Sequence, residues 1–94
     1  MLRIDTHYST ESTNFTVAGK LAGPWVKVLK ECWQTAVVER LGSAIMVTLA
    51  DVTFIDTAAR VLLTCMCRQG VALVPTGFLI EGIVEEIEAD VGRG

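Results

Sequence analysis

Residues 52–63, VTFIDTAARVLL, place the polar dipeptide Asp56-Thr57 between two apolar runs. Upstream of it, AIMVTLA at residues 44–50 is short, continuous and apolar, which is typical of a strand covered on both faces. Downstream, AARVLLTCMCRQ at residues 58–69 has the residue spacing of a helix. Asp56-Thr57 is therefore predicted to lie where a strand ends and a helix begins, the position at which α/β domains gather functional groups.

The rest of the chain continues this alternation of strands and helices. Apolar residues recur at every second position near the N-terminus and at every third or fourth position in the longer segments. The expected elements are strands at residues 2–8 and 15–19, a helix at 24–41, a strand at 44–50, a helix at 58–69, a strand at 71–75 and a last helix after Gly77.

This order of elements predicts the fold class. Helices that alternate with apolar strands indicate an α/β domain of two or three layers. The sheet should be mixed and mostly parallel, with four strands, an N-terminal antiparallel hairpin and three helices. Residues 1–91 are expected to form a single domain, and residues 92–94 are expected to fray.

Length and composition describe one small globular domain with an acidic balance. The chain has 94 residues, of which 51% are hydrophobic and 20% are charged. A chain of this size hides about 60 to 68% of its unfolded surface, which is enough for one core. The net charge of -3 argues against nucleic acids and anionic membranes as partners, because both attract clustered Lys and Arg.

The sequence also bears on where the protein works. No run approaches the roughly 20 apolar residues that cross a bilayer, so direct membrane insertion is not expected. The first residues, MLRIDTHYST, lack the basic-then-apolar order of a secretory signal. Three cysteines, an odd number without C-x-x-C spacing, fit a reducing compartment. We therefore expect a cytoplasmic protein.

Helical spacing assigns the residues of the two C-terminal helices to faces. On the helix after Asp56, the spacing predicts a polar stripe of Thr57, Arg60, Thr64 and Arg68 and an opposite face of Ala58, Leu62, Cys65 and Met66. On the last helix, it predicts an inward face of Leu79, Ile80, Ile83, Val84 and Ile87 and an outward face of Glu81, Glu85, Glu86 and Glu88. The glutamates are most simply a solubilising face.

The other chemically distinctive residues point to packing or to plain surface. Cys65 and Cys67 diverge by about 200° on a helix, so buried packing explains them better than a metal site. His7 stands alone on a strand and is expected on the surface, whereas Trp25 and Trp33 share a helical face and are expected in the core. Neither a phosphate loop nor a nucleophile motif is present. No metal, cofactor or catalytic residue is therefore assigned, and an enzyme is not expected.

With these elements in place, the chain resembles the STAS domain, the fold shared by anti-sigma-factor antagonists and the cytoplasmic tails of sulphate transporters. The resemblance covers nearly the whole chain. GKLAGP at residues 19–24 is similar to the family's loop before its first long helix. VTFIDTAARVLL is similar to the family's signature of two apolar residues, Asp and Ser or Thr, followed by a helix that starts with small residues.

The resemblance implies a role for the dipeptide. In anti-sigma antagonists the Ser or Thr after the signature Asp is phosphorylated by a partner kinase, and the surface around it docks that partner. By position, Thr57 is the expected phosphoacceptor. The expected partner-binding surface at the start of this helix comprises Asp56, Thr57, Arg60, Val61 and Thr64.

Two departures and one alternative accompany this expectation. The family commonly continues Ser/Thr-Gly-Leu-Gly, whereas residues 58–61 read AARV. Both glycines are therefore replaced by residues with side chains. In addition, Arg60 places a cation where an apolar residue is usual. The implied partner is a kinase-type anti-sigma factor.

The alternative is a constitutive STAS subunit of a bacterial lipid-transport complex, which docks a transport ATPase without phosphate. A homodimer is a further expectation, because small domains often complete their burial by pairing.

A structural explanation of the dipeptide is also open at this point. Asp and Thr are both favoured at helix N-caps, where a side-chain oxygen accepts an otherwise unpaired N–H and contributes about 1 kcal/mol. If Asp56 caps the helix, the hydroxyl of Thr57 stays free on the first turn, so capping and docking are compatible. A phosphate on Thr57 would then act as a binding switch and not as a folding switch.

Overall fold

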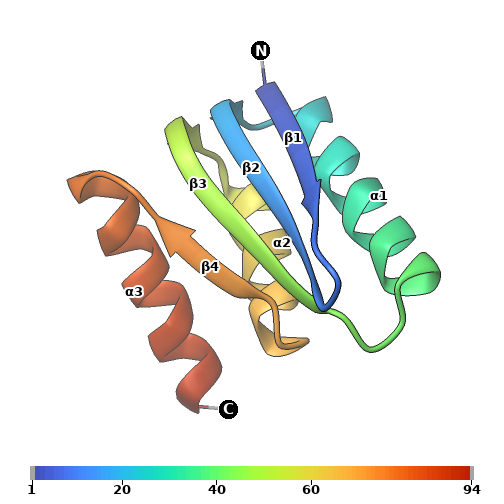
Figure 1. The fold of residues 1–94 in the computed structure, drawn as a ribbon. Coiled ribbons are helices and arrows are strands. Elements are labelled where there is room, and N and C mark those ends of the chain that lie inside the picture. The colour runs from blue at the N-terminus through green and yellow to red at the C-terminus, as the bar shows by residue number, and fades with distance from the viewer. Residues whose placement is uncertain (1, 94) are drawn as a thin grey trace.

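Four strands form one mixed sheet in the order β1-β2-β3-β4 (Figure 1). The computed structural model describes residues 2–93. Along the chain the elements are β1 Leu2–Tyr8, β2 Ser12–Leu21, α1 Pro24–Glu39, β3 Ala44–Ile55, α2 Thr57–Arg68, β4 Ala72–Pro75 and α3 Phe78–Arg93. β1 and β2 are antiparallel, and the two remaining pairs are parallel. The predicted fold class is therefore confirmed.

The two inner strands are longer than the sequence indicated. β2 runs from Ser12 to Leu21, and so extends beyond the predicted strand at residues 15–19 at both ends. β3 continues to Ile55 and therefore reaches Asp56 directly. At two register shifts, Ala50 and Thr53 of β3 have no partner in β2, so the 10 residues of β2 pair along the 12 residues of β3. As a result, Leu21 and Ile55 end side by side at the carboxyl edge of the sheet.

Arg40, just after α1, explains why β2 begins early. Its Nη1 donates hydrogen bonds of 3.0 Å to the Thr13 hydroxyl and to the Ser12 carbonyl oxygen. Its guanidinium also lies 5.0 Å from the centre of the Tyr8 ring, within the range of a cation–π contact. Because this cation satisfies the hydroxyl, Thr13 is fully buried although it is polar.

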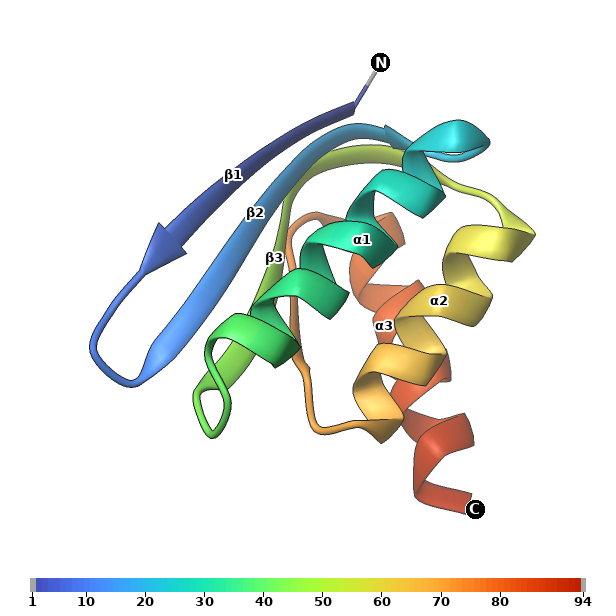
Figure 2. The same ribbon diagram turned by 90° about the vertical axis from the view of Figure 1, so that its right-hand side faces the viewer.

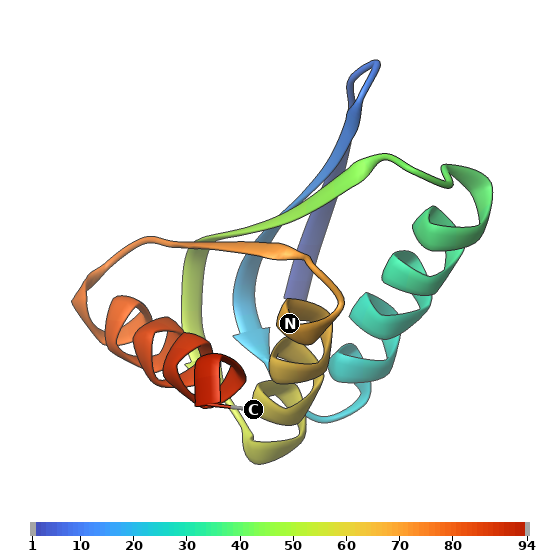
Figure 3. The ribbon, with the colours of Figure 1, turned by 90° about the horizontal axis from the view of Figure 1, so that it is seen from below.

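All three helices lie on one face of the sheet, and the other face is open (Figures 2 and 3). Burial alternates along β3: Val47 and Leu49 are fully buried, whereas Met46 and Thr48 are not. The prediction of a strand covered on both faces is therefore wrong for residues 44–50. Small and apolar side chains occupy the open face of β3, which made the run look continuous although only every second residue is covered.

The core lies between the sheet and the three helices. Its fully buried large side chains are Phe15, Val17, Leu21, Leu29, Val47, Leu49, Leu63, Met66, Val84 and Ile87. Trp33 is buried and Trp25 packs partly against the core, as predicted. His7 is exposed on β1, also as predicted. The fraying of residues 92–94 stays a prediction, because α3 is described through Arg93 and Gly94 lies outside the described residues.

The parallel strands direct the starts of the helices to one edge of the sheet. β2, β3 and β4 each end at this carboxyl edge and are followed there by α1, α2 and α3, respectively (Figure 1). Only one residue, Asp56, separates β3 from α2. The position predicted for functional groups is therefore the point where an inner strand passes directly into the middle helix.

Candidate functional site

Asp56 caps α2 and also binds the loop that precedes α1. One carboxylate oxygen accepts a hydrogen bond of 2.8 Å from the Ala59 N–H, in the first turn of α2. The other accepts a hydrogen bond of 2.9 Å from the Gly23 N–H. The Asp56 N–H donates to the Leu21 carbonyl oxygen at 3.3 Å. The capping hypothesis is therefore confirmed, and the cap also joins two segments that are far apart in the sequence.

Gly23, whose N–H donates to Asp56, has a positive φ. Its φ is 58°, a left-handed backbone value that residues other than glycine rarely adopt. Pro24 follows it directly as the first residue of α1. Gly23 precedes a helix that has no side-chain cap. The two segments that carry the family resemblance, GKLAGP and VTFIDTAARVLL, thus meet through one carboxylate.

The hydrogen bonds also shift the acidity of Asp56. The Gly23 N–H, followed by the Ala59 N–H, holds the pKa of the Asp56 carboxyl below its ordinary value of 3.8, whereas burial acts in the opposite direction. Both donors favour the charged form because they point at the carboxylate. Asp56 is thus held as an anion, and both of its oxygens are used within the protein.

We expect this carboxylate to make stability depend on pH. A group with a lowered folded-state pKa stabilises the fold above its unfolded pKa, here 3.8, and loses that contribution as the pH falls through the lower folded value. Asp56→Asn cannot titrate and has a single acceptor oxygen. It should lower Tm at neutral pH by roughly 4 to 8 °C, because the Gly23 N–H loses its charged acceptor. The difference in Tm between variant and wild type should narrow towards pH 2. Thermal unfolding followed by circular dichroism tests this, and an equal gap at both pH values would contradict it.

Thr57 is the first residue of α2, and its side chain is exposed. Among residues 2–93, no hydrogen bond engages its hydroxyl. This is the arrangement expected if Asp56 takes the cap position, because the hydroxyl is then left free on the first turn. Its use as a phosphoacceptor stays a prediction.

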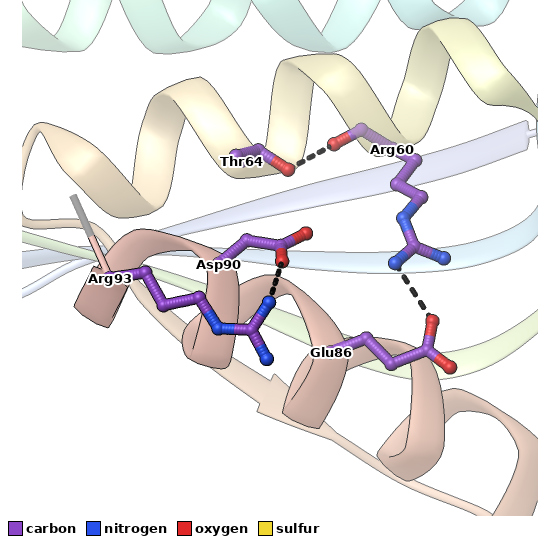
Figure 4. Close-up of polar contacts among 5 residues, drawn as sticks. All are labelled: Arg60, Thr64, Glu86, Asp90 and Arg93. Carbon is purple, nitrogen blue, oxygen red and sulfur yellow. Dashed lines mark hydrogen bonds and ion pairs between the residues drawn. The ribbon is translucent and has the colours of Figure 1, made fainter.

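Arg60 and Thr64 lie on the side of α2 that faces α3 (Figure 4). The Arg60 guanidinium is 2.8 Å from a carboxylate oxygen of Glu86, with side-chain exposures of 39% and 62%. The Thr64 hydroxyl donates to the Arg60 carbonyl oxygen at 2.8 Å. Arg60 therefore links α2 to α3. This ion pair gives a structural role to the cation at position 60, where the family usually has an apolar residue.

The inward face of α2 differs from the prediction. Leu62 and Met66 are buried as expected, but Ala58 and Cys65 are exposed. The buried set is Ala59, Leu62, Leu63 and Met66, which has the i, i+3, i+4, i+7 spacing of a helix that packs on a sheet. The exposure of Cys65 also contradicts its predicted burial, whereas Cys67 is half-buried.

On α3, four of the five residues predicted to face inward lie against the core. Ile80, Val84 and Ile87 are buried, and Ile83 packs partly against them. Leu79 is 68% exposed, so its predicted inward position is wrong. The four glutamates of the outward face are exposed, as predicted.

The exposed side of α2 separates two grooves. The groove between α1 and α2 has a volume of about 640 Å³, and the groove between α2 and α3 about 520 Å³. Val61 and Cys65 line both. The second groove brings together four of the five residues of the predicted partner-binding surface, namely Thr57, Arg60, Val61 and Thr64. Asp56 is not among them, because its carboxylate faces Gly23 and Ala59.

The described part of the chain, residues 2–93, has no helix with the length and apolar character of a membrane span. Neither a family model nor a curated protein sequence matches the chain.

Solved structures do match the fold. The chain is similar to the anti-sigma factor antagonist SpoIIAA in its unphosphorylated form, with a TM-score of 0.69 at 17% sequence identity, over 98% of this chain and 99% of that protein. It is also similar to an uncharacterised DUF3478-family protein with a SpoIIAA-like fold from Shewanella loihica PV-4. There the TM-score is 0.57 at 14% identity, over 83% of this chain and 69% of the other. The protein therefore has a SpoIIAA-like STAS fold, as the resemblance implied.

Proposed function

We propose that the protein is a non-catalytic interaction module of a bacterial regulatory switch, similar in role to an anti-sigma-factor antagonist. Its partner docks on the exposed side of α2, and phosphorylation of Thr57 controls the docking. The observation that carries this proposal is the exposed Thr57 hydroxyl at the start of α2, beside a capped and fully engaged Asp56. The similarity to SpoIIAA over nearly the full length of both chains supports the role.

The grooves beside α2 suit a protein partner. Val61 is 64% exposed, stands between the two grooves and gives a partner an apolar contact. Around it, Thr57 and Thr64 offer polar groups, and Arg60 offers a cation already paired with Glu86. Interfaces combine such an apolar centre with a polar rim.

A phosphate on Thr57 would alter this surface more than it would alter the fold. It adds about -1.5 to -2 charge. Water weakens its repulsion from the neighbouring Asp56 carboxylate, and the positive end of the helix dipole offsets part of that repulsion. Under a docked partner the phosphate must also lose water, which costs several kcal/mol unless a cation meets it. Docking is therefore the property that changes.

The experiment is phosphorylation by the cognate kinase. The protein is incubated with its cognate kinase and with ATP, and the intact mass is measured. The wild type should gain one phosphate, whereas Thr57→Val, which keeps the shape and lacks the hydroxyl, should gain none. If the wild type stays unmodified while the partner still binds, docking is constitutive. That result would replace the switch with a subunit that binds a transport ATPase.

A further inference from the structure

We propose that the free edge of β1 pairs with the β1 edge of a second copy of this chain, so that two sheets join into one. β1 is the outermost strand of the sheet order, and its seven residues pair with β2 without a register shift. A strand that is long, regular and free of proline offers a row of unpaired N–H and C=O groups. The second copy would satisfy these groups with antiparallel backbone hydrogen bonds.

The two edges of the sheet differ in how far they resist such pairing. β4, at the other edge, has only four residues and ends in Pro75, which has no N–H to donate. Short strands and prolines are the usual means by which proteins block an edge. β1 has neither, so the surface for a second strand lies on one side of the molecule only.

The side chains of β1 are complementary to themselves. Arg3 and Asp5 project on the open face of the sheet, and Ile4 projects on the helix side, where it pairs in register with the buried Val17. In an antiparallel pair centred on Ile4, each Arg3 lies opposite the partner's Asp5, and the two Ile4 side chains lie opposite each other. Opposite charges and apolar residues in directly facing positions stabilise a strand pair.

These charges are available for a second chain. Within one chain, Arg3 Nε lies 3.0 Å from an Asp5 carboxylate oxygen, and the side chains are 78% and 45% exposed. An exposed pair of this kind contributes little to a single molecule. Across the proposed two-fold axis the four charges would alternate in sign along one face, which sets the register of the two strands.

The helix side of the edge also leaves space for the second copy. A hollow of about 290 Å³ lies between β1 and α1 and is lined by Thr6 and Tyr8 of the strand and Val28 and Cys32 of the helix, among others. Figure 1 shows α1 on the side of β1 away from β2. A strand added beside β1 would therefore lie over α1 and cover the apolar part of this hollow.

The test is a charge exchange, read out as mass in solution by light scattering and sedimentation equilibrium. The wild type should be a dimer, and Arg3→Asp or Asp5→Arg alone should raise its dissociation constant by about tenfold or more, because each change places like charges opposite each other twice. The double variant Arg3→Asp/Asp5→Arg should restore the dimer. An equimolar mixture of the two single variants should form a mixed dimer.

Matched controls come from the pair Asp90 and Arg93 on α3, which has the same residue types and similar exposure. Arg93→Asp and Asp90→Arg should leave the dimer unchanged, and circular dichroism should show that every variant is folded. A monomeric wild type would overturn the proposal. So would single variants at Arg3 and Asp5 whose dimers have the same dissociation constant as the wild type. A double variant that stays monomeric would overturn the register and with it the pairing.

Discussion

Leu63→Ala is expected to lower the free energy of unfolding by about 3 to 5 kcal/mol. Leu63 is fully buried and belongs to the face on which α2 packs against the core. Truncation loses the transfer energy of the side chain and leaves a cavity, which the neighbouring core side chains fill only partly. Urea denaturation followed by circular dichroism measures the change.

The neighbouring exposed position serves as the control for Leu63. Val61→Ala removes a similar apolar group from the same helix, but Val61 is 64% exposed. Its effect on unfolding should stay within about 0.5 kcal/mol. If Leu63→Ala cost less than about 1 kcal/mol, α2 would not pack as described, and its outer surface would not be a rigid platform for a partner.

Val61→Glu is expected to weaken binding of the docked partner by about 100-fold without a loss of stability. Val61 stands between the two grooves, so a partner that covers α2 must bury this position. A carboxylate there must lose its water when the partner docks, and it replaces the apolar contact that Val61 offers. Calorimetric titration of the partner into wild type and variant measures the difference.

Val38→Glu is the matched control for Val61→Glu. Val38 is 73% exposed, and it lies near the end of α1, away from both grooves beside α2. The same substitution there should leave the affinity for the partner unchanged. An equal loss of affinity at the two positions would point to a non-specific effect of charge. If Val61→Glu caused no loss of affinity, α2 would not be part of the interface.

The order of strands and helices could be predicted because each element carries its own periodicity. The boundaries were harder, and β2 shows why. Thr13 belongs to a polar run that looks like a turn, yet it is buried because Arg40 binds its hydroxyl from the far end of α1. Nothing within the local sequence indicates that contact. The open face of the sheet was missed for a similar reason, since apolar residues line β3 on both sides.

The position of the site could be predicted, but most of its geometry could not. Asp56 and Thr57 were identified as a junction between strand and helix, and the cap followed from their residue types. The hydrogen bond from Gly23 joins residues 33 positions apart, and the Arg60–Glu86 pair joins two helices. Such contacts depend on how the elements pack. The rotation of α2, however, was readable from the spacing of its apolar residues at 59, 62, 63 and 66.

The most direct test of the proposed docking surface is to compare backbone amide hydrogen exchange of the protein alone with that of its complex with the partner protein. We expect slower exchange in the first two turns of α2, from Thr57 to Thr64, and in the parts of α1 and α3 that border the two grooves. We expect no change along the open face of the sheet. Protection of that open face with α2 unchanged would contradict the account, because the partner would then dock on the other side of the molecule.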